Sequence, residues 1–193
     1  MDSFYTEEEL MALGLKRCGK NVKISRRAMI YNADQIEIGN HVRIDDFCIL
    51  SGRIQFGDYI HIGVFTLLSG STGGMYLHDF SGVSYHSTIL ANSDVYSGEF
   101  LTNPMVPMKY RKMAPAPVVL EKHALVAAHC VVLPGITLGE GCAVGAMSLV
   151  LKNVDPWSIY FGIPAKRIKE RKRDLIQLEK KLREELGQGK EIF

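Results

Sequence analysis

Aliphatic residues recur every six positions along most of this chain. Six consecutive units fit without a gap, and they begin at Leu120, Val126, Val132, Leu138, Val144 and Val150. An α-helix repeats its apolar face every three or four residues and a strand every two, so this spacing fits neither element alone. It predicts short flat segments joined by regular corners, which is the pattern of a solenoid.

A second set of positions in the same frame is also predicted to point inward. The fifth residue of each unit is mostly small, and these residues are Ala124, Cys130, Ile136, Cys142, Ser148 and Val154. Upstream, further units begin at Ile38, Ile44, Phe56, Ile62, Leu68, Leu77, Val83 and Ile89. Because three such units complete one triangular coil, we expect an all-β solenoid over residues 20–163.

The frame fails between Ile89 and Leu120. Residues 91–117 interrupt the repeat and are rich in proline and polar residues. A loop of this length inside a compact repeat is uncommon unless it is disordered or functional, so we expect an extruded, functional loop. A smaller break near Gly74 predicts only an adjusted corner.

Both ends of the chain predict helices. Thr6 followed by Glu9 is a capping-box pattern, which predicts a short helix within an N-terminal segment of residues 1–19. Residues 164–193 are rich in helix-forming residues and predict a C-terminal helix. Its apolar stripe is expected to be a docking face and consists of Ile168, Leu175, Leu178, Leu182 and Leu186.

The charge balance gives no electrostatic case for nucleic acid binding, since 23 Lys and Arg stand against 21 Asp and Glu. The N-terminus opens acidic, without the pattern of a signal peptide, and no window has the length of a membrane span, so we expect a cytoplasmic protein. The cysteines lack CxxC spacing and no HExxH pattern occurs, so no metal site is expected. Cys48, Cys130 and Cys142 fall on inward positions and are expected as buried thiols.

The stretch VVLPGITLGEGCAVGAMSLVLKNVDPWSIYFGIPAKRI resembles the closing coils and the exit of the hexapeptide-repeat acyltransferases. The resemblance covers about residues 20–170. It implies a left-handed parallel β-helix that works as a homotrimer, a handedness that spacing alone does not give. RIDDFCILSG and NSDVYSGEFLTNP are similar to the N-acyltransferases of nucleotide-linked, in particular dTDP-linked, 4-amino-4,6-dideoxy sugars.

The resemblance also implies acyl-CoA as cosubstrate, lying in a groove between neighbouring prisms of the trimer. Ala128 and Ala146 match positions where small residues let the pantetheine arm pair with the backbone, although coil packing explains them equally well. Lys152, Lys166 and Lys169 match positions for cations that bind the CoA phosphates. The alternative for these lysines is a solvated surface. Leu151 stands where some relatives carry a hydroxyl, which removes one polar contact to CoA.

The expected reacting centre lies at the start of the loop. Many sugar O-acetyltransferases of this family place a histidine where this chain has Asp94. A hydroxyl needs a general base during attack, whereas an amine needs only to be neutral, so the missing histidine favours an amino sugar. Asp94 would orient the amine and help to collect its proton. Ser84 would bridge the amine and the thioester oxygen.

Other residues and functions remain alternatives. His86 is the alternative acid or base, and Tyr96 and Glu99 are expected to contact the sugar or the nucleotide. Each has a simpler role available, as does Asp94 as a loop cap and Ser84 as a surface serine. The alternative enzyme is a sugar O-acetyltransferase of the galactoside or maltose type. A β-helix assembly scaffold is the non-enzymatic alternative, and the long loop and the cationic PAKRIKERK exit argue against it.

Overall fold

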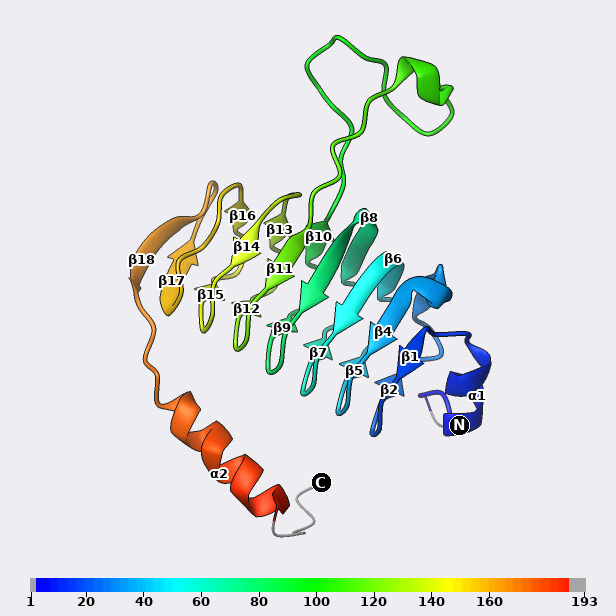
Figure 1. The fold of residues 1–193 in the computed structure, drawn as a ribbon. Helices are drawn as coiled ribbons and strands as arrows, with labels where there is room; N and C mark the ends of the chain where they lie inside the picture. Colours follow the sequence, from blue (N-terminus) through cyan, green and yellow to red (C-terminus); the bar gives the residue numbers. More distant parts are fainter. Residues whose placement is uncertain (1–2, 188–193) are drawn as a thin grey trace.

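The structure, a computed structural model, describes residues 3–187. Its short strands wind around a common axis as a triangular prism, so each regular coil crosses three flat faces (Figure 1). Strands of successive coils pair in parallel and in register, as Arg43 does with His61 and His61 with Gly82. The predicted all-β solenoid, a left-handed parallel β-helix with a short N-terminal and a longer C-terminal helix, is confirmed.

We name the faces A, B and C in the order in which the chain crosses them. Face A consists of β1 (Arg17–Cys18), β4 (Ile36–Ile38), the second halves of β6 (Ile49–Phe56) and β8 (Leu67–Leu77), β11 (Val118–Leu120) and β14 (Thr137–Leu138). Face B consists of β2 (Lys23–Ile24), β5 (Arg43–Ile44), β7 (His61–Ile62), β9 (Gly82–Val83), β12 (Leu125–Val126), β15 (Ala143–Val144) and β17 (Ser158–Phe161). Face C consists of β3 (Met29–Tyr31), the first halves of β6 and β8, β10 (Thr88–Leu90), β13 (Val131–Val132) and β16 (Leu149–Val150).

The core is the inside of the prism, and the six-residue frame selects it. The first residues of the units are buried throughout, as are the fifth residues of the six C-terminal units. Burying one aliphatic side chain contributes about 1.5–3 kcal/mol. The register that buries two residues per unit is therefore more stable than a register shifted by one residue, which would turn these side chains outward. Cys48, Cys130 and Cys142 are fully buried as predicted, and burial raises the pKa of Cys48 to about 11 and that of Cys142 to about 12.

Corners AB and BC, named for the faces that they join, are tight and carry stacked rings. The corner residues adopt left-handed backbone, for example His41 with φ of 56° and His86 with φ of 55°. The AB ladder contains His41, Tyr59, Phe80 and His123, with neighbouring ring centroids 4.6, 4.7 and 5.1 Å apart. The BC ladder contains Phe47, Phe65, His86 and His129, with centroids 4.8 Å apart at each step. Each aromatic pair contributes about 1 kcal/mol, which offsets the cost of left-handed backbone.

Corner CA is irregular. The strands β6 and β8 run through it without a break, and the short 3₁₀ helix η1 (Ala33–Gln35) occupies it in an earlier coil. Residues 91–117 leave the prism here, between β10 and β11, and project away from it (Figure 1). The base of this loop is closed by the Ala116 N–H, which donates to the Ala91 carbonyl at 3.0 Å. Its distal part contains the 3₁₀ helix η2 (Met108–Tyr110).

The N-terminal segment forms α1 (Glu7–Ala12), and the predicted capping box between Thr6 and Glu9 is present. The first strand, β1, begins at Arg17 and pairs with β4, so the solenoid starts a few residues before the expected boundary at residue 20.

The C-terminal segment corrects one prediction. The expected helix over 164–193 begins only at α2 (Leu175–Gly187), because β18 (Lys166–Glu170) pairs antiparallel with β17. Pairing satisfies backbone groups at the open edge of the last coil, and this gain overrides the helix propensity of the segment. Ile168 therefore lies in a strand and not on the helix stripe. The part of the expected helix beyond residue 187 falls outside the described residues.

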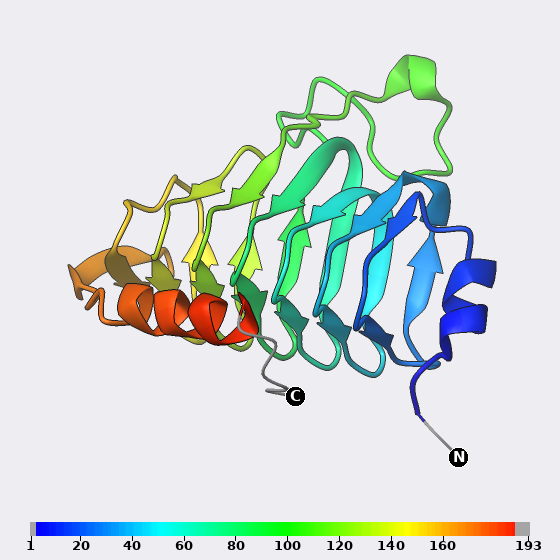
Figure 2. The ribbon, with the colours of Figure 1, turned by 60° about the horizontal axis from the view of Figure 1, so that its bottom comes forward.

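The helix α2 lies along the coils at corner AB (Figure 2). Its Glu179 is buried and receives three partners: Lys122 Nζ and Arg183 Nε at 2.7 Å from one carboxylate oxygen, and His123 Nε2 at 2.7 Å from the other. Burial raises the pKa of Glu179, but these hydrogen bonds outweigh it and lower the pKa to about 2. The docked helix is thus tied to the ring of His123 in the AB ladder.

Candidate functional site

Ser84 lies on the outer surface of face B. Its neighbour Val83 points into the core, so the alternation of a strand turns the Ser84 side chain outward. Its backbone is fixed, because Ser84 N–H donates to the Val126 carbonyl at 2.8 Å and its carbonyl accepts from Thr66 Oγ1 at 3.1 Å. A column of small residues runs past it from coil to coil: Gly63, Ser84, Ala127 and Gly145.

The sequence interpretation missed this column, although the sequence contains a signal for it. The four residues are the second positions of the units IGVFTL, VSYHST, VAAHCV and VGAMSL. Second positions point outward, but the space beside both glycines is already filled. The Phe161 ring lies where a Gly145 side chain would, and Tyr85 crowds the same position at Gly63. Gly63 is buried, whereas Ser84 and Ala127 are half-buried, so the accessible part of the column lies at Ser84 and Ala127.

Asp94 lies on the loop, where it bridges to Met113 across the loop ribbon. Its Oδ2 accepts a hydrogen bond from the Asn103 N–H at 3.3 Å. Its Oδ1 is buried and has no hydrogen-bond partner within residues 3–187. A buried carboxylate oxygen without a donor is costly, so a donor supplied from outside this chain would stabilise it.

The structure does not bring Ser84 and Asp94 together within one chain. Ser84 projects from face B, whereas the loop that bears Asp94 leaves from corner CA. In a triangular section, corner CA is the corner opposite face B, and the loop extends away from the prism (Figure 1). These two predicted residues can meet only if two copies of the chain are adjacent.

The other residues expected near the reaction are exposed. His86 is a member of the BC ladder and stacks between Phe65 and His129. It stays the predicted alternative acid or base. Tyr96 is 81% exposed on the loop, and its hydroxyl accepts from Ser93 Oγ at 3.1 Å. The Glu99 carboxylate accepts from Ser97 Oγ at 2.8 Å. Tyr96 and Glu99 remain predicted sugar or nucleotide contacts.

The residues expected to bind CoA lie on the C-terminal side of Ser84 along the prism. Ala128 and Ala146 are half-buried and stack one coil apart at corner BC, where the Met147 N–H donates to the Ala128 carbonyl at 3.0 Å. Lys166 and Lys169 are exposed on β18, and Lys152 is exposed just after β16. The Ala165 N–H donates to the Leu149 carbonyl at 2.8 Å, which holds the start of β18 beside β16.

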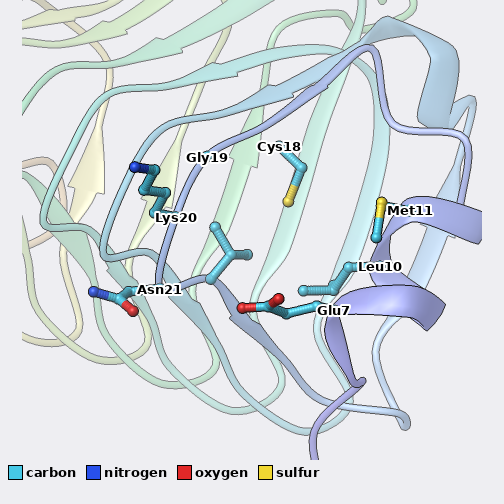
Figure 3. A pocket seen from close by; sticks show the side chains of 8 residues that line it. Glu7, Leu10, Met11, Cys18, Gly19, Lys20 and Asn21 are labelled. Atoms are coloured by element: carbon cyan, nitrogen blue, oxygen red, sulfur yellow. The ribbon is translucent and has the colours of Figure 1, made fainter.

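A hollow at the other end of the prism contains none of the predicted site residues. It has a volume of about 470 Å³ beneath α1 (Figure 3) and is lined by Glu7, Leu10, Met11, Cys18, Gly19, Lys20, Asn21 and Val22. Within residues 3–187, no group of three or more His, Cys, Asp and Glu side chains is placed to hold a metal ion. No helix of that part of the chain is long and apolar enough to cross a membrane.

Comparisons with known proteins identify relatives that match almost the whole chain. The chain is 39% identical over 180 residues to the dTDP-4-amino-4,6-dideoxy-D-glucose acyltransferase of Escherichia coli, covering 92% of this chain and 93% of that protein. No family model matches the sequence.

Solved structures agree. AntD, an N-acyltransferase from Bacillus cereus in complex with dTDP and 3-hydroxybutyryl-CoA, matches with a TM-score of 0.94 and 44% identity over 97% of this chain and 100% of that chain. Its S84A mutant in complex with dTDP-4-amino-4,6-dideoxyglucose and coenzyme A matches with a TM-score of 0.93, 44% identity, and coverage of 95% and 99%. From this identity and coverage, the chain belongs to the dTDP-4-amino-4,6-dideoxy-D-glucose acyltransferases within the hexapeptide-repeat acyltransferases.

Proposed function

We propose that this enzyme transfers an acyl group from acyl-CoA to the 4-amino group of a dTDP-linked 4-amino-4,6-dideoxy sugar. The observation that carries the proposal is the near-complete match to AntD, whose structures contain a dTDP-aminosugar or dTDP together with coenzyme A or an acyl-CoA. The substitutions in the AntD structures, at positions 84 and 94 of that protein, carry the same numbers as Ser84 and Asp94 here.

Asp94 and Ser84 have complementary roles in the proposed reaction. The neutral amine attacks the thioester carbonyl while one of its N–H groups donates to the free Oδ1 of Asp94, which aims the nitrogen lone pair. As the C–N bond forms, the thioester oxygen gains negative charge, and the Ser84 hydroxyl donates to it. Asp94 takes the proton that the nitrogen loses. The C–S bond then breaks, and the CoA sulfur leaves as a thiolate that takes up a proton.

The proposed assembly is a homotrimer, because Ser84 and Asp94 project from opposite sides of one prism. Three copies around an axis give three equal sites, each combining face B of one copy with the loop of another. The loop carries exposed apolar side chains that such contacts would cover, among them Met105 at 90% and Met108 at 64% exposure. We place the enzyme in the cytoplasm, the compartment that supplies acyl-CoA and nucleotide sugars.

The first experiment measures transfer from a panel of acyl-CoAs to dTDP-linked 4-amino-4,6-dideoxy sugars, with galactosides and maltose as competing acceptors. We expect an amide product, identified by its mass and by its resistance to mild base, which cleaves esters. Acylation of a sugar hydroxyl in preference to the amine would contradict the proposal. Ser84→Ala should lower turnover by about ten- to a hundredfold, as expected for one hydrogen bond to developing charge.

The second experiment tests the shared site by mixing two variants. Ser84→Ala and Asp94→Asn are each expected to have strongly reduced turnover alone, the second by about a hundredfold or more. After subunit exchange, some interfaces combine an intact Ser84 from one chain with an intact Asp94 from the other, and turnover should rise above that of either variant alone. If mass analysis verifies that subunits have exchanged and turnover does not rise, the shared site is contradicted. Sedimentation of a fully active monomer would contradict it as well.

A further inference from the structure

The outer surface of face B changes character along the prism at Ser84. The outward residues that precede each inward position are stacked in register from coil to coil: Lys23, Arg43, His61, Gly82, Leu125 and Ala143. On the N-terminal side of Ser84 this column is basic, and on the C-terminal side it is apolar or small. The two sides therefore suit different ligands, one anionic and one extended and largely uncharged.

The basic side is organised around a buried carboxylate. Asp45 is only 7% exposed, and its Oδ1 accepts from Arg43 Nε at 2.7 Å while its Oδ2 pairs with His61 Nε2 at 2.7 Å. The Arg43 guanidinium also lies over the Phe4 ring, 5.3 Å from its centroid. The side chains of Arg43 and His61 nevertheless remain 56% and 49% exposed. Asp45 thus fixes the direction of two side chains that are open to a ligand.

We propose that Arg43 and His61 bind the diphosphate of the nucleotide-linked sugar, an inference that rests on the proposed function. Neighbouring coils are about 5 Å apart, so His61 lies about 5 Å and Arg43 about 10 Å from the level of Ser84 along the prism. A sugar whose 4-amino group is at Ser84 extends across its ring to the anomeric oxygen and the diphosphate. That span places the phosphates at the level of His61 and Arg43.

The donors available at this level fit a diphosphate. Within residues 3–187, the terminal Nη atoms of Arg43 and the Nδ1 of His61 have no hydrogen-bond partner. A guanidinium presents two parallel N–H groups to phosphate oxygens. With Nε2–H committed to Asp45, the His61 ring donates from Nδ1 when it is protonated. Asp45 offsets part of the positive charge of Arg43 and His61. The direction of their N–H donors, as well as their charge, therefore determines which ligand they bind.

The room beyond Arg43 fits the rest of such a ligand. A hollow of about 470 Å³ opens at corner AB and is lined by Asn21, Lys23, His41, Val42 and Arg43. It continues the line from Ser84 through His61 and Arg43, where the nucleoside follows the diphosphate. The two cosubstrates then approach Ser84 from opposite ends of face B, and neither has to cross the other.

The test titrates dTDP into the purified full-length enzyme and into Arg43→Gln and His61→Gln. We expect the dissociation constant for dTDP and the Michaelis constant for the dTDP-aminosugar to rise about ten- to a hundredfold in Arg43→Gln, as expected for one charge-assisted contact. The Michaelis constant for acyl-CoA should stay at the parental value. Arg17→Gln is the matched control, because Arg17 is also 56% exposed but lies on face A.

The outcomes separate this site from the proposed reaction. Arg43→Lys keeps the charge and the fold but loses the paired N–H groups, so it should weaken dTDP binding less than Arg43→Gln. A parent that acylates the aminosugar, with variants that bind dTDP as tightly as the parent, would overturn the diphosphate site alone. A parent that binds dTDP through Arg43 but acylates no aminosugar would instead overturn the proposed reaction and support the site.

Discussion

Corners AB and BC repeat one arrangement from coil to coil, whereas corner CA breaks it. At the regular corners, left-handed residues such as Tyr59 and Phe65 stack their rings on those of the coils above and below. At corner CA, β6 and β8 run straight through and the loop of residues 91–117 leaves the prism. The regular corners hold the coils together. The irregular one carries Asp94, whose buried Oδ1 has no donor among the residues that the structure describes. Regularity in this fold serves stability, and under the proposed function its interruption carries the residue that orients the amine.

The largest effect is expected at the irregular corner. Asp94→Asn keeps the size of the side chain but loses the charge that accepts the amine proton, so turnover should fall by about a hundredfold or more. The Michaelis constant for acyl-CoA should hardly change, and steady-state kinetics with the dTDP-aminosugar measure both. Asp34→Asn makes the same chemical change in η1, at the same corner, and should behave as the parent. Parental turnover in Asp94→Asn would remove Asp94 from the mechanism.

A smaller effect is expected on β18, at the C-terminal end of the prism. Lys166→Ala should raise the Michaelis constant for acyl-CoA by a factor corresponding to about 1–3 kcal/mol, the loss of one charge-assisted contact to a CoA phosphate. The constant for the aminosugar should not change. Lys180→Ala, on exposed α2 surface, is the control. Equal effects on both constants would point to a damaged fold and not to a phosphate contact.

The regular corner AB is tested through α2. Glu179→Gln leaves His123, Lys122 and Arg183 without their shared carboxylate, and we expect a loss of about 2 kcal/mol in unfolding free energy with turnover per folded enzyme unchanged. Thermal and denaturant unfolding measure this loss. Glu184→Gln, whose ion pair with Lys180 is exposed and 3.9 Å long, should lose much less.

The same substitution has a pH signature. The folded pKa of Glu179 is about 2, below its ordinary 4.5, so the ionised carboxylate stabilises the folded state above about pH 4.5. This contribution is lost as the pH falls from 4.5 towards 2 and the carboxyl becomes protonated. The stability difference between the parent and Glu179→Gln should therefore narrow over that range. A difference that stays constant there would mean that the ion pairs do not account for it.

The smallest effect is expected in the BC ladder. His86→Phe keeps a ring that can stack on Phe65 and His129, so both turnover and the unfolding midpoint should stay close to the parental values. Kinetics over a range of pH would check that the pH dependence of turnover is the same as in the parent. A loss as large as that of Asp94→Asn would support His86 as the acid or base and would place chemistry at a regular corner.

The sequence predicted the inside of the prism well because burial repeats locally. Val126 and Val144 each occupy the first position of a unit, and that position alone decides that they point inward. The ring ladders could have been found in the same way. His41 and Tyr59 are the fourth residues of their units, and histidine or an aromatic residue recurs at that position in several others.

Features that depend on distant segments were beyond the sequence pattern. The pairing of Glu179 with His123 joins residues 56 positions apart, and no local period relates them. The lysines and arginine of β18 favour a helix and so predict one there, and only pairing at the open edge of β17 makes this segment a strand. The separation of Ser84 from Asp94 by the width of the prism likewise requires the order of faces in three dimensions. Their predicted roles stay predictions until the variants are measured.

Because the residues of face B stack in register, the distances between residues along this face are fixed by the number of coils that separate them. Each coil advances the surface by about 5 Å and presents the next residue of the same column, so positions along the face change only in whole steps. Inserting or deleting one complete coil between Arg43 and Ser84 would change the distance between their levels by about 5 Å while leaving every corner intact. An enzyme of this fold can adapt to a longer or shorter substrate by gaining or losing a coil, while the residues at the two ends of the site stay the same.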